Sequence, residues 1–154
     1  MLIDFMRGLT YSVNLVVTSD EDGNPHGATI SSLISLNVNP QKEELLLVLK
    51  KNSHTITMLR KTPLFTISLL NCHQSEVAKY FSMSREILNS HEHLIPSRFQ
   101  EKIVHFAINP SAELVCEFAK DYIQDESVIV IANVLQTKIN DLSRVLTYSQ
   151  RTYN

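Results

Sequence analysis

The sequence is poor in the residues that mark several common kinds of binding site. It has only three glycines among 154 residues, which excludes a glycine-rich phosphate loop and the Gly-x-Gly-x-x-Gly fingerprint of dinucleotide-binding folds. It has two cysteines, Cys72 and Cys116, and no Cys-x-x-Cys pair. We therefore expect reduced thiols, as in a cytoplasmic protein, rather than a disulfide framework.

Excess positive charge and long apolar runs are also missing. The formal net charge is −2, and no basic run is interleaved with aromatic residues, so nucleic acid is not an expected partner. The longest apolar runs, 45–49 and 128–132, are too short to span a bilayer. The first residues include Asp4 and lack the basic-then-apolar order of a secretory signal. These absences predict a cytoplasmic protein that binds neither membrane nor nucleic acid.

Apolar and β-branched segments of strand length dominate the chain. Two of them, 11–18 and 27–36, flank the turn-rich segment 20–25 and predict an antiparallel hairpin. Further strands are expected at 44–50, 64–70, 112–123 and 127–139. No linker or repeat divides the chain, so we predict a single domain over residues 1–154. Its fold class is mainly β, as a closed or nearly closed antiparallel barrel with a few short helices.

Three short helices are expected between these strands. Ser53 can cap the first, which carries Ile56 and Leu59 on one face. The segment 74–82 has apolar residues at helical spacing. The segment 97–106 opens with a Ser-x-x-Gln capping-box pattern and predicts the third helix.

Small hydroxyl side chains gather in segment 26–35, "HGATISSLIS", and again where the first helix should begin. A dianionic phosphate is favoured at a helix N-terminus. Ser53 and Thr55 stand at that point, with Lys50 and Lys51 just ahead. Two interpretations remain open. The residues form a phosphate site that the neighbouring strand completes, or they are a helix cap, two surface lysines and a polar edge strand.

Metal and nucleophile chemistry find little support. His91 and His93 lie on one side of an extended segment, but no third ligand follows at a fixed spacing, so no metal site is predicted. Cys72 and His73 are sequence neighbours, which point to opposite faces of a strand. Cys116 lies in an apolar pattern typical of a buried thiol. We therefore predict no catalytic side chain.

Taken in order, these segments resemble the flavin reductase-like family of FMN-binding split barrels. The matching segments are "VVTSDEDGNPHGATISSLIS" (16–35), "LLLVLKKNSHT" (45–55), "LFTISLLNCHQSEVAKYFS" (64–82), "AELVCEF" (112–118) and "VLTYSQRTY" (145–153). The resemblance covers nearly the whole chain. It implies an antiparallel Greek-key split β-barrel, decorated by short helices.

The resemblance also implies what the hydroxyls do. It places three residues along the flavin ring and ribityl chain: Thr29, Ser31 and Ser32. It places three more at the phosphate: Ser53, Thr55 and, as a charge partner, Lys51. It implies FMN as cofactor, with FAD as the alternative, and hydride transfer from NAD(P)H to the flavin. It further implies a homodimer with the flavin near the subunit interface, and a monooxygenase as recipient of reduced flavin.

One departure from the family pattern affects this expectation. The family often carries Gly-Asp-His before its last long strand, and here the matching stretch is Gln124-Asp125-Glu126. A carboxylate in place of the imidazole repels a phosphorylated dinucleotide. Two other functions therefore stay open: an FMN-binding carrier or sensor that does not turn over NAD(P)H, and a barrel interaction protein without a cofactor.

Overall fold

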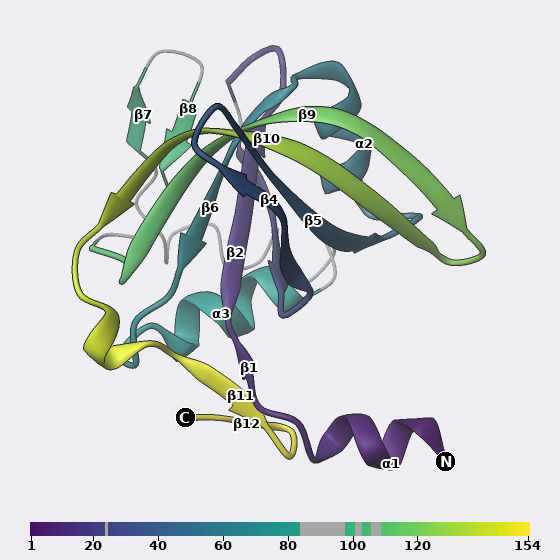
Figure 1. Cartoon of the computed structure of the whole chain (residues 1–154), viewed down its shortest axis with the longest axis vertical. Helices are drawn as coiled ribbons and strands as arrows, with labels where there is room; N and C mark the ends of the chain where they lie inside the picture. Colours follow the sequence, from purple (N-terminus) through teal and green to yellow (C-terminus); the bar gives the residue numbers. More distant parts are fainter. Residues whose placement is uncertain (24, 84–97, 101–102, 106–108) are drawn as a thin grey trace.

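A seven-stranded antiparallel sheet forms the body of the protein. The computed structural model describes residues 1–23, 25–83, 98–100, 103–105 and 109–154. The strand order is β3-β2-β6-β9-β10-β5-β4, and the long strands β9 and β10 arch over the rest (Figure 1). The strands are β2 (Asn14–Ser19), β3 (Pro25–Ile30), β4 (Leu33–Asn39), β5 (Lys42–Lys50), β6 (Leu64–Leu69), β9 (Ala112–Gln124) and β10 (Ser127–Ile139). The predicted mainly-β fold is confirmed.

The two end strands of this sheet, β3 and β4, come from one stretch of chain. The sequence predicted a single strand over 27–36, and this is wrong, because the strand breaks at Ser31 and Ser32. The Ser32 hydroxyl accepts a hydrogen bond from the Val48 N–H and donates one to the Val48 carbonyl, both at 3.1 Å. This side chain fastens the crossing between β3 and β4 to the middle of β5. It thus joins the two ends of the curled sheet where ladder pairing is interrupted.

We expect Ser32→Ala to lower the free energy of unfolding by about 1–3 kcal/mol, because it leaves the N–H and carbonyl of Val48 without their partner. Urea unfolding followed by circular dichroism measures the change. Ser31→Ala is the matched control, since Ser31 is exposed and its loss should be nearly neutral. Equal effects of the two substitutions would contradict this assignment.

Apolar side chains fill two clusters, one on each side of β2. The first lies inside the curled sheet and includes Val16, Leu47 and Phe65. The second packs Leu15 and Val17 against Phe81 of helix α3 (Ser75–Ser82) and against the C-terminal segment. All six residues of β2 are buried as a result. The two helices predicted from Ser53 and from segment 74–82 are confirmed as α2 (His54–Lys61) and α3.

The predicted third helix, over 97–106, is wrong. The structure has two short strands there, β7 (Arg98–Gln100) and β8 (Ile103–His105), paired antiparallel with Phe99 opposite Val104. The β-branched pair Ile103 and Val104 favours extended backbone, and the pairing of β7 with β8 outweighs the local capping-box pattern.

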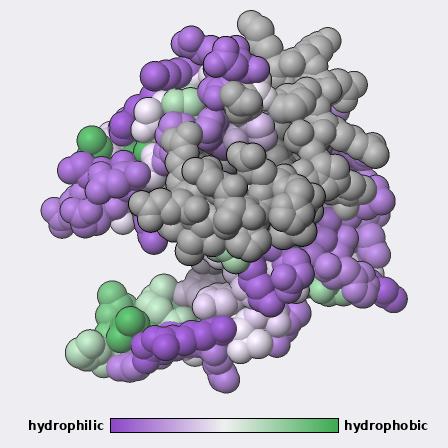
Figure 2. All heavy atoms as spheres, turned by 180° about the vertical axis from the view of Figure 1, so that it is seen from behind, coloured by the Kyte–Doolittle hydropathy of each residue, from purple (hydrophilic) through white to green (hydrophobic). Residues whose placement is uncertain are grey.

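The two chain ends meet in a small second sheet that the sequence pattern did not reveal. Its order is β1-β11-β12, from strands β1 (Tyr11–Ser12), β11 (Thr147–Ser149) and β12 (Thr152–Tyr153). A 3₁₀ turn, η2 (Leu142–Arg144), leads into it. The N-terminal helix α1 (Leu2–Arg7) projects from this sheet, away from the body (Figures 1 and 2). Among the described residues, no helix is long and apolar enough to cross a membrane.

Candidate functional site

The N-terminus of α2 has the properties of an anion site. Ser53 ends the preceding loop in extended conformation, and its hydroxyl oxygen accepts the Ile56 N–H at 3.3 Å, so the helix begins at His54. The first turn carries no acidic residue, and Arg60 and Lys61 occupy the last turn. No carboxylate of the helix therefore offsets the positive end of the helix dipole.

Thr55 adds an available hydroxyl at this helix end. The residue is only 3% exposed, and its hydroxyl makes no hydrogen bond within the described part of the chain. No buried polar side-chain atom in that part lacks a partner, so the Thr55 oxygen must reach the surface. A ligand at the start of α2 can therefore use this hydroxyl without breaking a bond of the fold.

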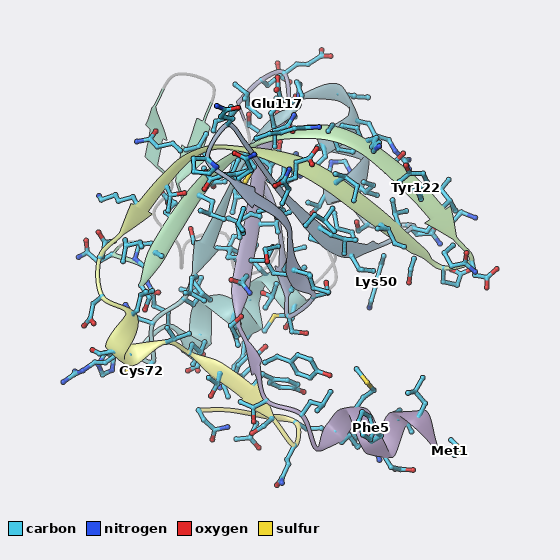
Figure 3. All side chains as sticks on the ribbon, in the orientation of Figure 1. Met1, Phe5, Lys50, Cys72, Glu117 and Tyr122 are labelled. Carbon is cyan, nitrogen blue, oxygen red and sulfur yellow. The ribbon has the colours of Figure 1, made fainter. Side chains whose placement is uncertain are left out.

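The turn between β9 and β10 lies against the same helix end. The Lys51 N–H donates to the Glu126 carbonyl at 2.9 Å, and Lys50 pairs with Ser127 at the start of β10. Asp125 adopts a left-handed φ of 50° within this turn. In Figure 3, Lys50 projects from the underside of the hairpin, on the side of α1. The structure thus places the backbone of Lys50 and Lys51 beside the turn that carries Asp125 and Glu126.

A salt bridge holds α2 against the hairpin from its other end. The Arg60 guanidinium contacts one carboxylate oxygen of Asp121 through Nε at 2.8 Å and through a terminal nitrogen at 2.7 Å. Both Arg60 and Asp121 are partly shielded from solvent. This contact adds a tie at the end of a helix whose buried Ile56 and Leu59 already hold it against the sheet.

The three residues predicted to lie along the flavin ring differ in whether their hydroxyls are already hydrogen-bonded within the protein. Thr29 donates to the Ala78 carbonyl at 2.7 Å, which ties β3 to α3, and Ser32 is held by Val48. Their hydroxyls are therefore used by the fold in this structure. Ser31 is exposed between β3 and β4, like Lys51 ahead of α2. Of the six predicted residues, Lys51, Ser53 and Thr55 lie together at the helix end.

A histidine pair beside this helix end was missed by sequence reasoning. The rings of His26 on β3 and His54 at the start of α2 have centroids 4.2 Å apart. The Nε2 of His26 lies 3.3 Å from a carboxylate oxygen of Asp20. The pair links β3 to α2 and so brings the hydroxyl segment next to the anion site. No spacing rule could have found it, because only the folded sheet brings the two rings together.

Metal and thiol chemistry are not supported in the described part of the chain. No group of three or more His, Cys, Asp or Glu side chains there could hold a metal ion, and the His91 and His93 pair lies outside the described residues. Burial raises the pKa of the Cys116 thiol to about 12, so it stays protonated and unreactive at neutral pH. Cys72 is free and partly exposed.

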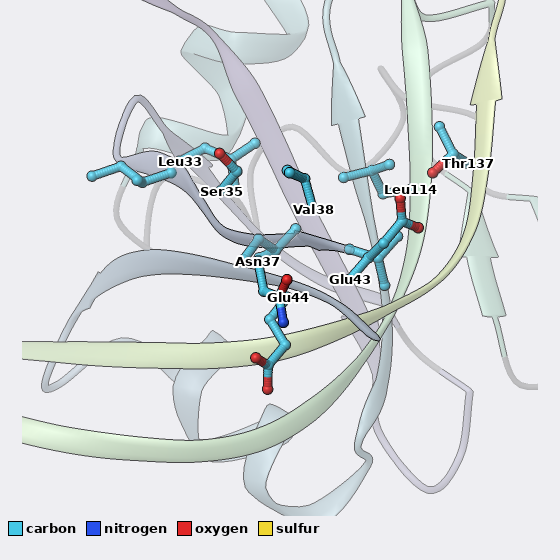
Figure 4. Close-up of a pocket in the computed structure, with 11 residues that line it drawn as sticks. Leu33, Ser35, Asn37, Val38, Glu43, Glu44, Leu114 and Thr137 are labelled. Atoms are coloured by element: carbon cyan, nitrogen blue, oxygen red, sulfur yellow. The ribbon is translucent and has the colours of Figure 1, made fainter. Parts of the chain in front are cut away.

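A groove of about 220 Å³ lies elsewhere, on the edge of the sheet (Figure 4). Its walls come from β4, β5, β9 and β10 and are mostly apolar, including Leu33, Val38, Leu114 and Val134. It contains none of the six predicted site residues.

Solved structures with the same fold include several flavin reductases. The styrene monooxygenase flavin reductase SMOB from Pseudomonas putida S12 is similar with a TM-score of 0.84 and 18% identity, over 99% of this chain and 95% of that one. The NADH:FAD oxidoreductase SgcE6 from Streptomyces globisporus C-1027 gives 0.83 and 18%, over 99% and 90%. BorF, the flavin reductase component of a bacterial two-component tryptophan halogenase, gives 0.82 and 18%, over 99% and 94%.

The comparison with protein families covers almost the whole chain. No curated protein matches. The sequence profile described as "Flavin reductase like domain" matches residues 6–154. Together with the split-barrel sheet, this match confirms the resemblance drawn from the sequence. The chain belongs to the flavin reductase-like family.

Proposed function

We propose that this protein binds FMN with its phosphate at the start of α2 and passes a hydride from NAD(P)H to the flavin. The observation that carries the proposal is the surface-reaching hydroxyl of the 97%-buried Thr55 beside the capped start of α2. Flavin held there would supply the hydride-accepting chemistry, in which two electrons pass from the dinucleotide to the flavin ring. The family membership supports this reaction class.

In this proposal the residues of the chain bind and orient rather than react. The Ser53 hydroxyl donates its proton to a phosphate oxygen while its own oxygen continues to cap α2. Thr55 donates a second hydrogen bond, and Lys51 supplies positive charge. The exposed Ser31 faces the ribityl chain or ring, and Thr29 and Ser32 hold β3 and its crossing in place. No side chain needs to transfer a proton for the hydride step.

Fluorescence titration with FMN, FAD and riboflavin tests the binding half of the proposal. Riboflavin has the same ring and ribityl chain but no phosphate, so its affinity reports the ring and ribityl contacts alone. We expect FMN to bind about 10²- to 10⁴-fold more tightly than riboflavin, because of two hydrogen bonds to a charged group. Equal affinity for FMN and riboflavin would reject the helix end as the phosphate site. Tighter binding of FAD than of FMN would assign the alternative cofactor.

A second candidate function rests on the carboxylates of the β9–β10 turn. Asp125 and Glu126 are exposed, and the backbone of Glu126 is bonded to Lys51. These charges oppose the approach of a second phosphorylated molecule beside bound FMN. On this account the protein is an FMN carrier or sensor that does not turn over NAD(P)H.

Glu126→Gln tests whether this carboxylate opposes the dinucleotide. We expect KM for NADPH to fall by about two- to fivefold, since a repulsion of about 0.5–1 kcal/mol between exposed charges is removed. The value of kcat should be unchanged. Asp22→Gln, at an exposed position on another turn, is the matched control. An unchanged KM would mean that Glu126 does not face the dinucleotide, and high salt should reduce the difference between variant and wild type.

Three further parts of the proposal concern domain organisation, cellular location and oligomeric state. We propose that residues 1–154 form a single domain, that the protein acts in the cytoplasm, and that it is a homodimer that delivers reduced flavin to a monooxygenase. The names of the similar structures support the last part, because SMOB and BorF are the reductase components of a monooxygenase and a halogenase. Light scattering measures the dimer directly.

A further inference from the structure

Two histidines from different elements are in contact beside the start of α2. The rings of His26 and His54 have centroids 4.2 Å apart and are tilted by 60° to each other. His54 is the first residue of α2 and lies between Ser53 and Thr55, the two residues proposed to bind the phosphate. The imidazole is the side chain whose charge ordinarily changes between about pH 5 and pH 8. The pair can therefore bring a proton-dependent positive charge to the phosphate site.

A carboxylate contacts one member of this histidine pair. The Nε2 of His26 lies 3.3 Å from an oxygen of Asp20, and these side chains are only 14% and 26% exposed. The Asp20 carboxylate balances one positive charge on the pair. A second positive charge would lie beside the first, at the ring distance of 4.2 Å, and like charges that close repel each other. An anion near His54 would remove this obstacle.

The remaining charges near the pair come from the elements that pack against β3 and α2. β2 has no titratable side chain. On α3, Glu76 and Lys79 pair with each other at 2.9 Å. At the far end of α2, Arg60 pairs with Asp121. The other titratable groups of these surroundings are Glu21 and Asp22 of the β2–β3 turn, Lys42, Glu43, Glu44 and Lys50 of β5, Lys51 before α2, Lys61 of α2, Tyr80 of α3, and Asp125 and Glu126 of the β9–β10 turn. Asp20 is thus the carboxylate that the structure places in contact with the pair.

We propose that His54 is a specificity-determining residue for phosphorylated flavin, and that it takes up a proton when the phosphate binds at the start of α2. A dianionic phosphate there balances the charge of His54 as Asp20 balances that of His26. The proton comes from the buffer, and no covalent bond of the flavin changes. The inference rests on the proposed phosphate site and adds to it a residue that is not among the six predicted ones.

This coupling determines the sign of the pH dependence. Because binding takes up a proton, the affinity for FMN rises as the pH falls. Free FMN opposes this trend below about pH 6, where its own phosphate takes up a second proton. Riboflavin has no phosphate and should show no such rise. The effect of His54 is therefore best measured between about pH 6.5 and pH 8.5.

Isothermal titration calorimetry of the wild-type protein with FMN measures the proton uptake directly. The binding enthalpy at about pH 7.2 is compared in Hepes and Tris, which differ in heat of ionisation and contain no phosphate. We expect uptake of about half a proton or more per FMN and none for riboflavin. His54→Gln should abolish most of the uptake. His73→Gln is the matched control, since His73 is exposed and adjoins Cys72, far from Lys50 in Figure 3.

Fluorescence titration across the pH range separates the charge of His54 from a structural role. We expect His54→Gln to weaken FMN binding about tenfold at about pH 6.5 and about twofold or less at about pH 8.5. The affinity for riboflavin should not change. His54→Lys stays positively charged over this range, so it should restore FMN binding and remove its pH dependence. A purely structural contact between β3 and α2 predicts equal losses at both pH values and no rescue by lysine.

Each outcome bears on the inference separately from the proposed function. If FMN binds far more tightly than riboflavin, but without proton uptake and with no effect of His54→Gln, the role of His54 is refuted and the phosphate site stands. Equal affinity of the wild-type protein for FMN and riboflavin at every pH would reject the phosphate site and the inference together. Proton uptake that persists in His54→Gln but is lost in His26→Gln would assign the charge to His26 and overturn the role of His54.

Discussion

Replacing Ser53 and Thr55 together by alanine should weaken FMN binding by about 10²- to 10⁴-fold. Each hydrogen bond to a charged group is worth about 1.5–3 kcal/mol, and two such bonds to the phosphate are lost. The two residues share one short stretch at the start of α2, where the Ser53 oxygen already caps the helix. Fluorescence titration with FMN and riboflavin measures the loss of affinity. The affinity for FMN should fall and the affinity for riboflavin should stay the same.

Loss of the helix cap must be separated from loss of phosphate contacts. Ser53→Asp does this, because aspartate caps a helix as well as serine does but sets a negative charge against the phosphate. We expect it to keep the stability of the protein and still weaken FMN binding. Thr57→Ala, at an exposed hydroxyl of the same helix, is the neutral control. If riboflavin loses as much affinity as FMN, then Ser53 and Thr55 stabilise the fold and do not bind the phosphate.

Gly27→Val should destabilise the protein by about 3 kcal/mol, the largest stability effect that we expect. A Cβ at Gly27 would lie 2.8 Å from both Cδ1 and Cε1 of Phe81 and 3.1 Å from the Val16 carbonyl oxygen. Overpacking of this kind forces neighbouring backbone or side chains to move. Phe81 is 7% exposed and belongs to the cluster between β2 and α3, so it has little room to give.

A double-mutant cycle with Phe81→Leu assigns that cost to the contact. In the smaller leucine background, Gly27→Val should cost clearly less than in the wild type. Gly8→Ala is the matched glycine control, since a Cβ there meets only the Phe5 carbonyl oxygen at 3.4 Å, an ordinary contact. Urea unfolding measures the four proteins of the cycle and the Gly8→Ala control. Additive costs would show that the ring of Phe81 is not what excludes a side chain at position 27.

Local signals in the sequence were sufficient for some elements. The start of α2 was predictable because a helix cap needs only Ser53 and the next three residues. The strands that became β5 and β6 are compact apolar runs, which favour buried extended segments. The phosphate residues at the helix end followed from the same local reasoning, together with the family resemblance.

The rest of the site depends on partners that are distant in sequence. The break at Ser31 and Ser32 is held by Val48, 16 residues away, and nothing in the hydroxyl segment itself signals it. The contact of Lys51 with Glu126 and the contact between the tilted rings of His26 and His54 appear only when the sheet curls. The predicted helix at 97–106 failed for the opposite reason, because a local capping pattern was outweighed by pairing of β7 with β8.

Anaerobic mixing of the purified protein with FMN and NADH, followed at the flavin absorption band, tests the central claim most directly. The proposal predicts that the band bleaches in step with stoichiometric oxidation of NADH, and that without protein the bleaching is far slower. Tight binding of FMN without bleaching by NADH or NADPH would contradict hydride transfer and establish the carrier or sensor function. Failure to bind any flavin would contradict the flavin site altogether and leave the hydroxyl segment as a structural crossing of the barrel.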